Sequence, residues 1–334
     1  MNLKRRALLG FLAASAWLGV SSASAAAPKC AKPPKPTYVL KLGTAFATGH
    51  ILVDAAEKFK ELVEADTKGG IEIQITTAAD TEDNVNVQTS QGVWDIQATG
   101  GPPLQVFAPE YFFFNGPYVI KDYAHFLRVW NGPLGDEAKD LVEANGNMVA
   151  LGTVYRGFRQ MTSNVPIAGT ADLVGLRLRL PNVPTWVSVW SSLETVPTIV
   201  ALGALHDALR DGLVDASEGD LSQISSLKLY EVQSNLTLTN HLVGVGWMFI
   251  NQASLERLPR GYQHKLQKAM KQATEFATQK MIDSESALLV SLADSGMTVG
   301  VPDADAIREK ARPAVDALFA TQWPVTTWAE VLAQ

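Results

Sequence analysis

The segment RLRLPN at 177–182 carries the residue types best suited to holding an anionic ligand. In a strand, successive side chains point to opposite faces, so Arg177 and Arg179 share one face and two leucines share the other. Pro181 ends such a strand because it lacks the backbone N–H that the ladder needs. A guanidinium is planar and permanently charged, and it forms two parallel hydrogen bonds with a carboxylate. The segment therefore predicts a carboxylate site at the end of this strand, and alternation alone does not separate Arg177 from Arg179.

Motifs for nucleotide, metal or nucleophilic chemistry are missing from the sequence. It contains no GxGxxG, Walker A, HExxH, GxSxG or paired CxxC motif in a supporting context. The five histidines lack the spacing of metal ligands. Ser191 and Ser192 with His206 come nearest to a nucleophile and base, but these serines lie in a predicted helix without the sharp turn of a nucleophile elbow. We expect no cofactor, no metal and no enzymatic activity, with a periplasmic hydrolase as the disfavoured alternative.

The first 25 residues have the composition of a secretory signal peptide. Basic residues at 4–6 precede an apolar run at 7–20, and ASA at 23–25 offers a cleavage site. The arginine pair in the basic stretch also fits a twin-arginine signal, but a general-secretion leader is the favoured interpretation. Residues 26–37 are rich in Pro and Lys and predict an extended tether. We expect an exported protein that works in the periplasm.

The whole chain has the composition of a globular protein, with 47% hydrophobic and 19% charged residues. Its 334 residues fit two domains once a leader is removed. The net charge of −6 argues against nucleic acid as a partner, because phosphate binding needs a concentrated basic surface. Cys30 is the only cysteine, so no intramolecular disulfide is expected and the core must supply the stability.

Strands and helices alternate along the folded part. Strands are predicted at 38–45, 71–76 and 94–99, with helices at 51–66 and 81–91 between them. This order predicts an α/β fold with a parallel, doubly wound sheet. Later strands are predicted at 147–155, 157–164, 177–181 and 241–251, and one long helical stretch covers 256–296. Two α/β lobes with a long helix spanning both predict a periplasmic-binding-protein fold, whose central ligand cleft lies at the carboxyl ends of the strands.

Several ordered segments resemble the DctP-like substrate-binding subunits of tripartite ATP-independent periplasmic (TRAP) transporters. They are GTAFATGH at 43–50, GPYVIKDYAHFLRVWNGPLG at 116–135, GFRQMTSNVPI at 157–167, DLVGLRLRLPN at 172–182, the VPT turn at 196–198 and a long block at 208–241. The resemblance implies a two-lobe receptor that closes on a small organic acid and delivers it to membrane permease subunits. A receptor of an ATP-driven importer, or a sensor, is the alternative with the same fold.

We place lobe I at 38–156 and 245–284, and lobe II at 157–244 and 285–334. The strands near 154–158 and 241–247 are the predicted hinges. A monomer is the expected state, which is compatible with one cleft for each chain.

The resemblance also selects site residues. Arg179 matches the arginine that clamps the substrate carboxylate in the family, and Arg159 matches a second arginine that shapes the cleft or touches the carboxylate. Asn182 has donors and an acceptor that suit a hydroxyl or a carboxylate. His50 precedes a predicted helix and matches a histidine often found at this place in the family, which makes it a candidate for a role at the cleft rim.

Two departures from the family pattern affect ligand identity. Many members have Gln-Glu-Asn-Pro where this chain has Ser-Glu-Gly-Asp at 217–220, so Glu218 is kept, Gly219 replaces a ligand-binding Asn, and Asp220 adds a carboxylate. The loop TAADTED at 77–83 is acidic where the family is mostly neutral. Its carboxylates, Asp80, Glu82 and Asp83, either line the cleft and favour a substrate with an amine or several hydroxyls, or cap the following helix.

Aromatic side chains at strand ends and helix starts complete the predicted ligand site. Most Trp and Phe residues in such a chain belong to the core, so each is only a candidate for contact with the ligand. The candidates are Phe46, Tyr155, Trp186, Trp190 and Trp247. His206 and His241 are expected to have structural roles.

Overall fold

The structure is a computed structural model, and it describes residues 36–334. The predicted signal peptide, nearly all of the predicted tether and Cys30 lie outside the described residues. Within 36–334, no helix has the length and apolar character needed to cross a membrane.

The chain begins with a parallel group of three strands, as the alternating pattern predicts. β1 (Tyr38–Thr44) pairs in parallel with both β2 (Ile71–Thr76) and β3 (Ile96–Thr99). Helices α1 (Ile51–Asp66) and α2 (Glu82–Ser90) make the connections. The apolar face of α1 is buried, because its apolar residues recur at helical spacing along the side that packs on the sheet.

A second parallel group lies further along the chain. β5 (Arg177–Leu180) pairs in parallel with β6 (Val196–Ile199) and β7 (Ala216–Asp220). The sequence predicted only a turn at 196–198, whereas this segment is strand β6. The helices of this group are α6 (Pro184–Ser192), α7 (Leu205–Arg210) and α8 (Leu221–Ser226).

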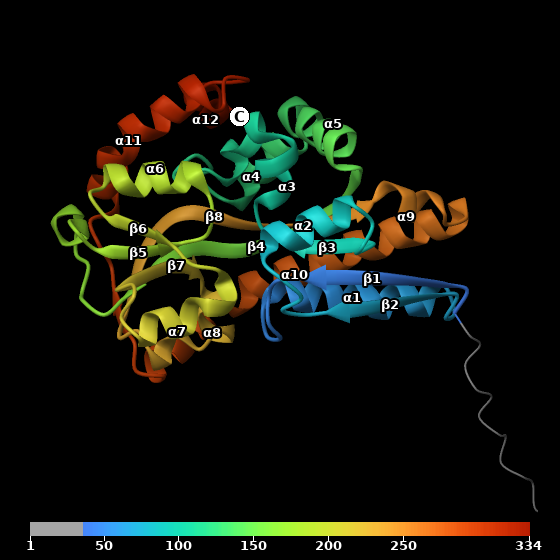
Figure 1. The fold of residues 1–334 in the computed structure, drawn as a ribbon, viewed down its shortest axis with the longest axis horizontal. Helices are drawn as coiled ribbons and strands as arrows, with labels where there is room; N and C mark the ends of the chain where they lie inside the picture. Colours follow the sequence, from blue (N-terminus) through green and yellow to red (C-terminus); the bar gives the residue numbers. More distant parts are fainter. Residues whose placement is uncertain (1–35) are drawn as a thin grey trace, which may run out of the picture. The chain divides into compact units, whose positions relative to one another are not determined.

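Two long antiparallel strands join the groups into one hydrogen-bonded sheet. β4 (Met148–Ser163) and β8 (Asn235–Asn251) pair with each other, β8 also pairs with β3, and β4 also pairs with β7. The order is β2-β1-β3-β8-β4-β7-β5-β6, with β9 (Thr298–Gly300) against β8. Figure 1 shows β4 and β8 passing between the two groups. The prediction of a parallel sheet is therefore wrong for its centre, and the strands predicted at 147–155 and 157–164 are one strand.

The remaining helical segments come from both the first and the second half of the chain. They are α3 (Pro102–Phe107), the 3-10 segment Pro109–Asn115, α4 (Tyr123–Trp130), α5 (Pro133–Gly146), α9 (Gln252–Glu256), α11 (Ala304–Thr321) and α12 (Trp328–Ala333). Further 3-10 turns lie at Thr170–Leu173, Leu202–Ala204 and Leu229–Glu231.

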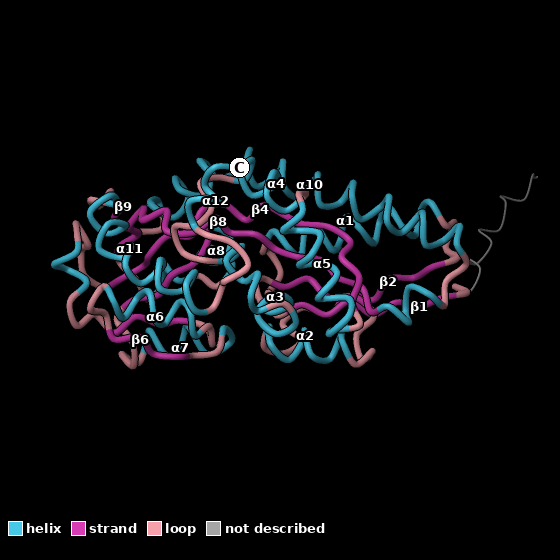
Figure 2. The backbone as a smooth tube through the Cα atoms, turned by 90° about the horizontal axis from the view of Figure 1, so that it is seen from above, coloured by secondary structure: helices cyan, strands magenta, loops and turns pink. Residues whose placement is uncertain are grey.

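The longest helix, α10 (Arg260–Asp294), contains 35 residues. At 1.5 Å per residue it is about 52 Å long. It packs beside α1 and β4, as Figure 2 shows for α1. Met281 lies in the larger hydrophobic cluster and Leu292 in the second, smaller one. The predicted long helix is thus confirmed as an element that spans both parts of the core, and it starts after Pro259 rather than at 256.

Candidate ligand-binding site

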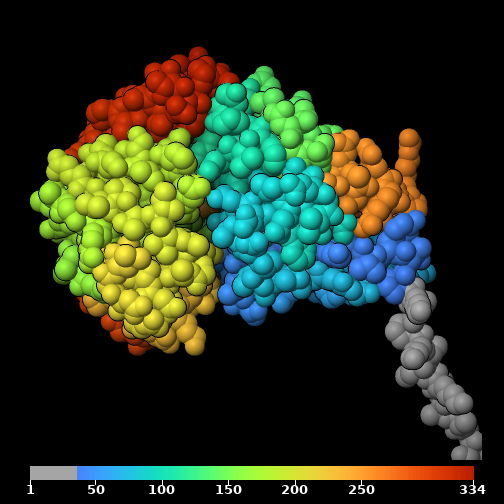
Figure 3. All heavy atoms as spheres, in the orientation of Figure 1, coloured from blue at the N-terminus to red at the C-terminus, as the bar shows by residue number. Residues whose placement is uncertain are grey.

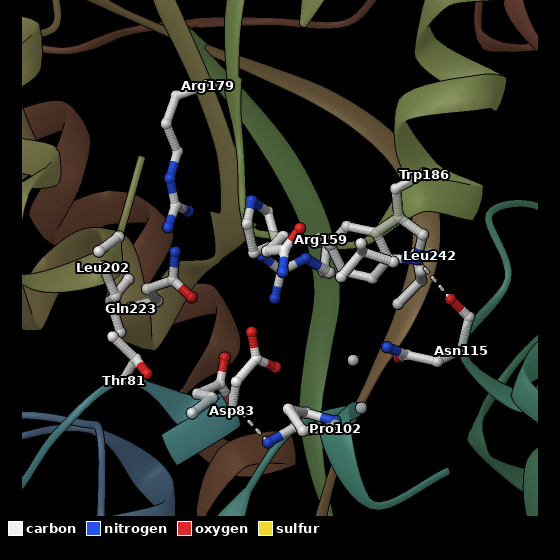
Figure 4. A pocket seen from close by; sticks show the side chains of 18 of the residues that line it. Thr81, Asp83, Pro102, Asn115, Arg159, Arg179, Trp186, Leu202, Gln223 and Leu242 are labelled. Carbon is white, nitrogen blue, oxygen red and sulfur yellow. Dashed lines mark hydrogen bonds between the residues drawn. The ribbon is translucent and has the colours of Figure 1, made fainter. Parts of the chain in front are cut away.

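A cavity of about 170 Å³ lies where several strands end. The loops that follow β3, β5 and β6 contribute Gly100, Pro181 and Val200. The start of α2 contributes Thr81, Glu82 and Asp83 on the other side. Side chains from both parallel groups therefore face one space at the carboxyl ends of the strands, as expected for an open α/β sheet. Figure 4 shows Arg159 and Arg179 reaching into this space, with Asp83 and Pro102 opposite them.

Arg179 is a buried cation of the cavity that forms no ion pair within residues 36–334. It lies on β5, is only 2% exposed, and its Nε donates to the Val200 carbonyl at 2.8 Å. Among residues 36–334 it forms no ion pair within 4 Å. Burial lowers the pKa of Arg179 to about 10, which still leaves it charged at neutral pH. Arg177, by contrast, is exposed and pairs with Asp215, so the structure separates the two arginines that alternation does not.

Arg159 is held by a buried carboxylate. Its Nε lies 2.5 Å and its Nη2 lies 2.8 Å from the two carboxylate oxygens of Glu218. Burial alone would raise the pKa of Glu218, but the Arg159 charge and the hydrogen bonds of His241 and Arg159 hold it at about 2. The guanidinium also lies 5.1 Å from the centre of the Trp186 ring. Arg159 therefore lines the cavity, and the Glu218 carboxylate holds its guanidinium in place and balances its charge.

A third arginine, Arg156, also lines the cavity and was not predicted from the sequence. Its Nε donates to Asp220 at 3.0 Å, and its Nη2 lies 2.7 Å from the same carboxylate oxygen. The guanidinium stacks over the Phe46 ring at 4.6 Å. The charges of Arg156 and Arg159, with His50 as hydrogen-bond partner, overcome burial and keep the pKa of Asp220 well below its ordinary value. The Asp220 that departs from the family pattern is therefore the counter-ion of this arginine.

Glu218 and Asp220 were predicted as ligand-binding residues, and the structure places them in the layer behind the arginines. Both are buried on β7 behind the arginines and neither lines the cavity. Gly219 between them does not line it either. A Cβ at Gly219 would lie 2.6 Å from Nε2 of Gln223, so the glycine leaves room for the Gln223 side chain, which does reach the cavity. Gln223 was missed because nothing in its own sequence neighbourhood distinguishes it.

Some residues of the acidic segment at the start of α2 cap this helix, and others line the cavity. Thr81 is the N-cap and accepts from the Asn84 N–H at 3.2 Å, while the exposed Asp80 accepts from the Thr81 N–H and the Asn84 amide. Glu82 and Asp83 line the cavity instead. Both predicted roles therefore occur, on different residues.

The aromatic candidates fall into three groups. Trp186 lines the cavity, and Phe46 lies one layer back, beneath Arg156. Trp190 and Trp247 are buried in the core, where Trp247 packs edge-to-face against Phe126 and Trp130. Tyr155 packs against Tyr123 with ring centres 5.0 Å apart. Strand-end position made each of these rings a candidate for ligand contact, and of the five Trp186 is the one that lines the cavity.

The two histidines near the cavity belong to its supporting layer. His50 stacks on Phe46 at 3.8 Å, and its Nε2 lies 3.8 Å from Asp220. Nε2 of His241 lies 3.3 Å from Glu218. Burial lowers the pKa of both rings. His50 is completely buried rather than at a rim, which corrects the prediction of a rim position.

Polar contacts link the two halves across the mouth of the cavity. Nε1 of Trp186 donates to the Asn115 carbonyl at 2.7 Å, and Nε2 of Gln105 donates to the Asn182 carbonyl at 3.0 Å. Asn182 also lines the cavity, as predicted from its place after Pro181. Figure 3 shows the halves meeting along a narrow seam on the face drawn.

The alternative hydrolase site is not assembled. Ser191 and Ser192 lie on α6, whereas Nε2 of His206 on α7 lies 3.4 Å from Glu231. Among residues 36–334, no cluster of His, Cys, Asp or Glu is arranged to hold a metal ion. The arrangement that residues 36–334 do present is a buried binding cavity with three arginines.

Residues 42–322 match the family described as bacterial extracellular solute-binding protein, family 7. The chain belongs to this family. The resemblance to DctP-like TRAP receptors is thereby confirmed, and with it the two-lobe α/β fold and the transport function. Family 7 consists of substrate-binding receptors rather than enzymes, and TRAP receptors work with membrane permease subunits.

Relatives of this family-7 protein share about a quarter of its residues. The sialic acid-binding periplasmic protein of Vibrio cholerae is 28% identical over 276 residues, which is 82% of this chain and 86% of the relative. The C4-dicarboxylate-binding periplasmic protein of Rhodobacter capsulatus is 27% identical over 73% of this chain and 74% of its own length. A TRAP solute-binding protein of Roseobacter denitrificans, solved with bound L-galactonate, is 27% identical, with a TM-score of 0.83 over 89% of this chain and 99% of the other.

Proposed function

We propose that this chain captures a small organic acid in the cavity, with Arg179 as the partner of the ligand carboxylate, and delivers it to the permease subunits of a TRAP transporter. In this proposal the mature protein is a periplasmic monomer that is exported by general secretion and performs no catalysis.

The buried, unneutralised charge of Arg179 is the observation that carries the proposal. Arg156 and Arg159 each have a carboxylate of their own, but Arg179 has only a carbonyl within residues 36–334. A buried charge without a counter-ion is costly. A ligand carboxylate would supply both the missing charge and the missing hydrogen-bond acceptors.

The relatives support the same chemistry. Sialic acid, C4-dicarboxylates and L-galactonate differ in size and in hydroxyl content, but each carries a carboxylate. We therefore propose that the ligand of this chain also carries a carboxylate. The other residues of the cavity determine what the rest of the ligand is.

Closure of the lobes is the second part of the proposal. We keep the boundaries of lobe I at 38–156 and 245–284, and of lobe II at 157–244 and 285–334. The bonds from Trp186 to Asn115 and from Gln105 to Asn182 join these lobes across the seam. The register shift between Tyr155 and Gly157 supports a hinge at 154–158. Small-angle scattering should show compaction when a ligand is added, and an unchanged radius would contradict closure.

A thermal-shift screen first identifies an organic acid that binds the protein. Isothermal titration with that acid then tests whether Arg179 is the partner of its carboxylate. Arg179→Ala removes the one guanidinium that has no carboxylate of its own and should weaken binding by about 2–5 kcal/mol, or thirty-fold to several-thousand-fold. Arg177→Ala is the control, because Arg177 lies on the same strand but is exposed and pairs with Asp215. Wild-type affinity in Arg179→Ala, or a larger loss in Arg177→Ala, would overturn the assignment.

A further inference from the structure

The charges around the cavity do not balance before a ligand binds. Arg156, Arg159 and Arg179 line it. Arg156 is paired with Asp220 and Arg159 with Glu218, and both of these acids lie behind the residues that line the cavity. Two further carboxylates, Glu82 and Asp83, line the wall itself. With every group ionised, carboxylates exceed guanidiniums by one, and the ligand carboxylate on Arg179 would bring another negative charge.

Glu82 and Asp83 lie in the first turn of α2, where the helix dipole favours negative charge, but neither provides the N-cap. Thr81 and Asp80 already cap α2. Glu82 accepts one hydrogen bond, from the Gly100 N–H at 2.6 Å. Neither Glu82 nor Asp83 forms an ion pair within residues 36–334. Their side chains are half-buried, and burial followed by the charge of Glu82 raises the pKa of Asp83 against the opposing effect of a hydrogen bond with Asn182.

A second observation connects these acids with a ligand rather than with solvent. Arg179 is 98% buried by its surroundings and reaches into the same cavity from the opposite lobe, as Figure 4 shows. Within residues 36–334, the cavity thus has Arg179 on one side and Glu82 and Asp83 on the other, and none of these three charged groups forms an ion pair within 4 Å. A small molecule that lies between the walls would touch both.

We infer that the ligand is zwitterionic: its carboxylate binds Arg179, and a cationic group at its other end, such as an ammonium, binds Glu82 and Asp83. This inference rests on the proposed carboxylate site. A second carboxylate at the far end would lie against two like charges in a partly dry cavity, so dicarboxylates should be excluded. A hydroxyl at that end would donate a hydrogen bond but would leave the acidic wall without its counter-ion.

The test compares ligands that differ only at the far end. The probes are 4-aminobutyrate, 4-hydroxybutyrate and succinate, with 5-aminovalerate, 5-hydroxyvalerate and glutarate as the longer set. Isothermal titration against the full mature chain at neutral pH should give tightest binding for an amino acid of one set, and binding at least ten-fold weaker for its dicarboxylate. Asp83→Asn and Glu82→Gln keep size and hydrogen-bonding capacity but remove charge. Each should reduce the preference for the amino acid over the dicarboxylate by about ten-fold or more.

Asp80→Asn is the matched control, because Asp80 belongs to the same loop but is exposed and outside the cavity, and it should keep the wild-type preference. Tightest binding of a dicarboxylate or a hydroxy acid, or an unchanged preference in both charge-removing variants, would overturn the inference. If a dicarboxylate or a hydroxy acid binds most tightly and its affinity still falls in Arg179→Ala, the proposed carboxylate site is retained and only the inference of a zwitterionic ligand is overturned. Absence of binding by all six probes would overturn the zwitterion, and retained binding in Arg179→Ala would overturn the carboxylate site itself.

Discussion

Gly157 lies opposite Gly244 in the ladder between β4 and β8, at the point where both strands pass from one parallel group to the other. Gly157 has φ of +85°, and a Cβ at Gly244 would lie 2.6 Å from the Gly157 carbonyl oxygen. The backbones therefore approach more closely than side chains allow. This contact lies within the proposed hinge strands, and Gly157 directly follows the cavity-lining Arg156.

Substitution of either glycine should destabilise the protein. In Gly244→Ala the new methyl group collides with backbone, and in Gly157→Ala the residue adopts a strained φ, so we expect a loss of about 1–3 kcal/mol in the free energy of unfolding. Urea denaturation measures this loss. Gly261→Ala is the control, because this site in α10 is open and alanine favours helix. Equal stability of all three variants would show that the close approach is not required.

Replacing the guanidinium by an ammonium should restore only part of the affinity. Arg179→Lys keeps a positive charge on β5 but loses the planar pair of donors, so its affinity should fall between those of the wild type and Arg179→Ala. Titration with the acid that binds the wild type most tightly measures this order. An affinity equal to that of the wild type would show that charge alone suffices and that no bidentate contact is made.

The bond across the seam should contribute to ligand affinity more than to folding. Trp186→Phe removes the Nε1 donor to Asn115 but keeps an aromatic ring beside Arg159. The loss of one such bond corresponds to about 0.5–1.5 kcal/mol, which is a two- to ten-fold weaker ligand affinity. Trp190→Phe on the same helix is the control, because Nε1 of Trp190 has no partner among residues 36–334. Equal affinity of both variants would contradict a role for the bond in closure.

Acid should weaken the fold through Glu218. Its pKa is about 2 in the folded protein and 4.5 ordinarily, because Arg159 and His241 outweigh burial. A depressed pKa stabilises the folded state above pH 4.5, and this stabilisation is lost as the pH falls toward 2, by on the order of 3 kcal/mol. Glu218→Gln should therefore be less stable at neutral pH and should vary less in stability between pH 5 and pH 2. Denaturation curves at several pH values measure this.

Glu309→Gln is the control for that series, since Glu309 pairs with Arg312 at the surface. It should follow the wild type throughout, because exposed pairs contribute little. A pH profile of Glu218→Gln that is parallel to the wild type would show that this buried pair is not the source of the acid sensitivity.

Local patterns predicted the first parallel group, the long helix and strand β5 with its end at Pro181 correctly, but they missed β6 and β7 of the second group. They failed at the centre of the sheet, because β4 and β8 pair with each other and with strands far along the chain, and local patterns do not reveal the direction of such distant neighbours. Arg156 was missed for a related reason. Register shifts in β4, including the one between Tyr155 and Gly157, interrupt simple alternation, so sequence spacing does not show which side chains face the cavity. The one available signal was Asp220, an added carboxylate that needed a cation.

The pairing of β8 with β3 constrains the order in which the molecule folds. Ile96 in β3 pairs with Ile250 in β8, so the sheet of the first half is completed by a strand from far along the chain. Contacts between such distant residues close large loops and slow folding. A fragment that ends after β4 would expose the open edge of β3, and open edges promote aggregation. The N-terminal half should therefore remain dependent on the C-terminal half during synthesis and refolding, and the two halves should not be separable by cutting the chain.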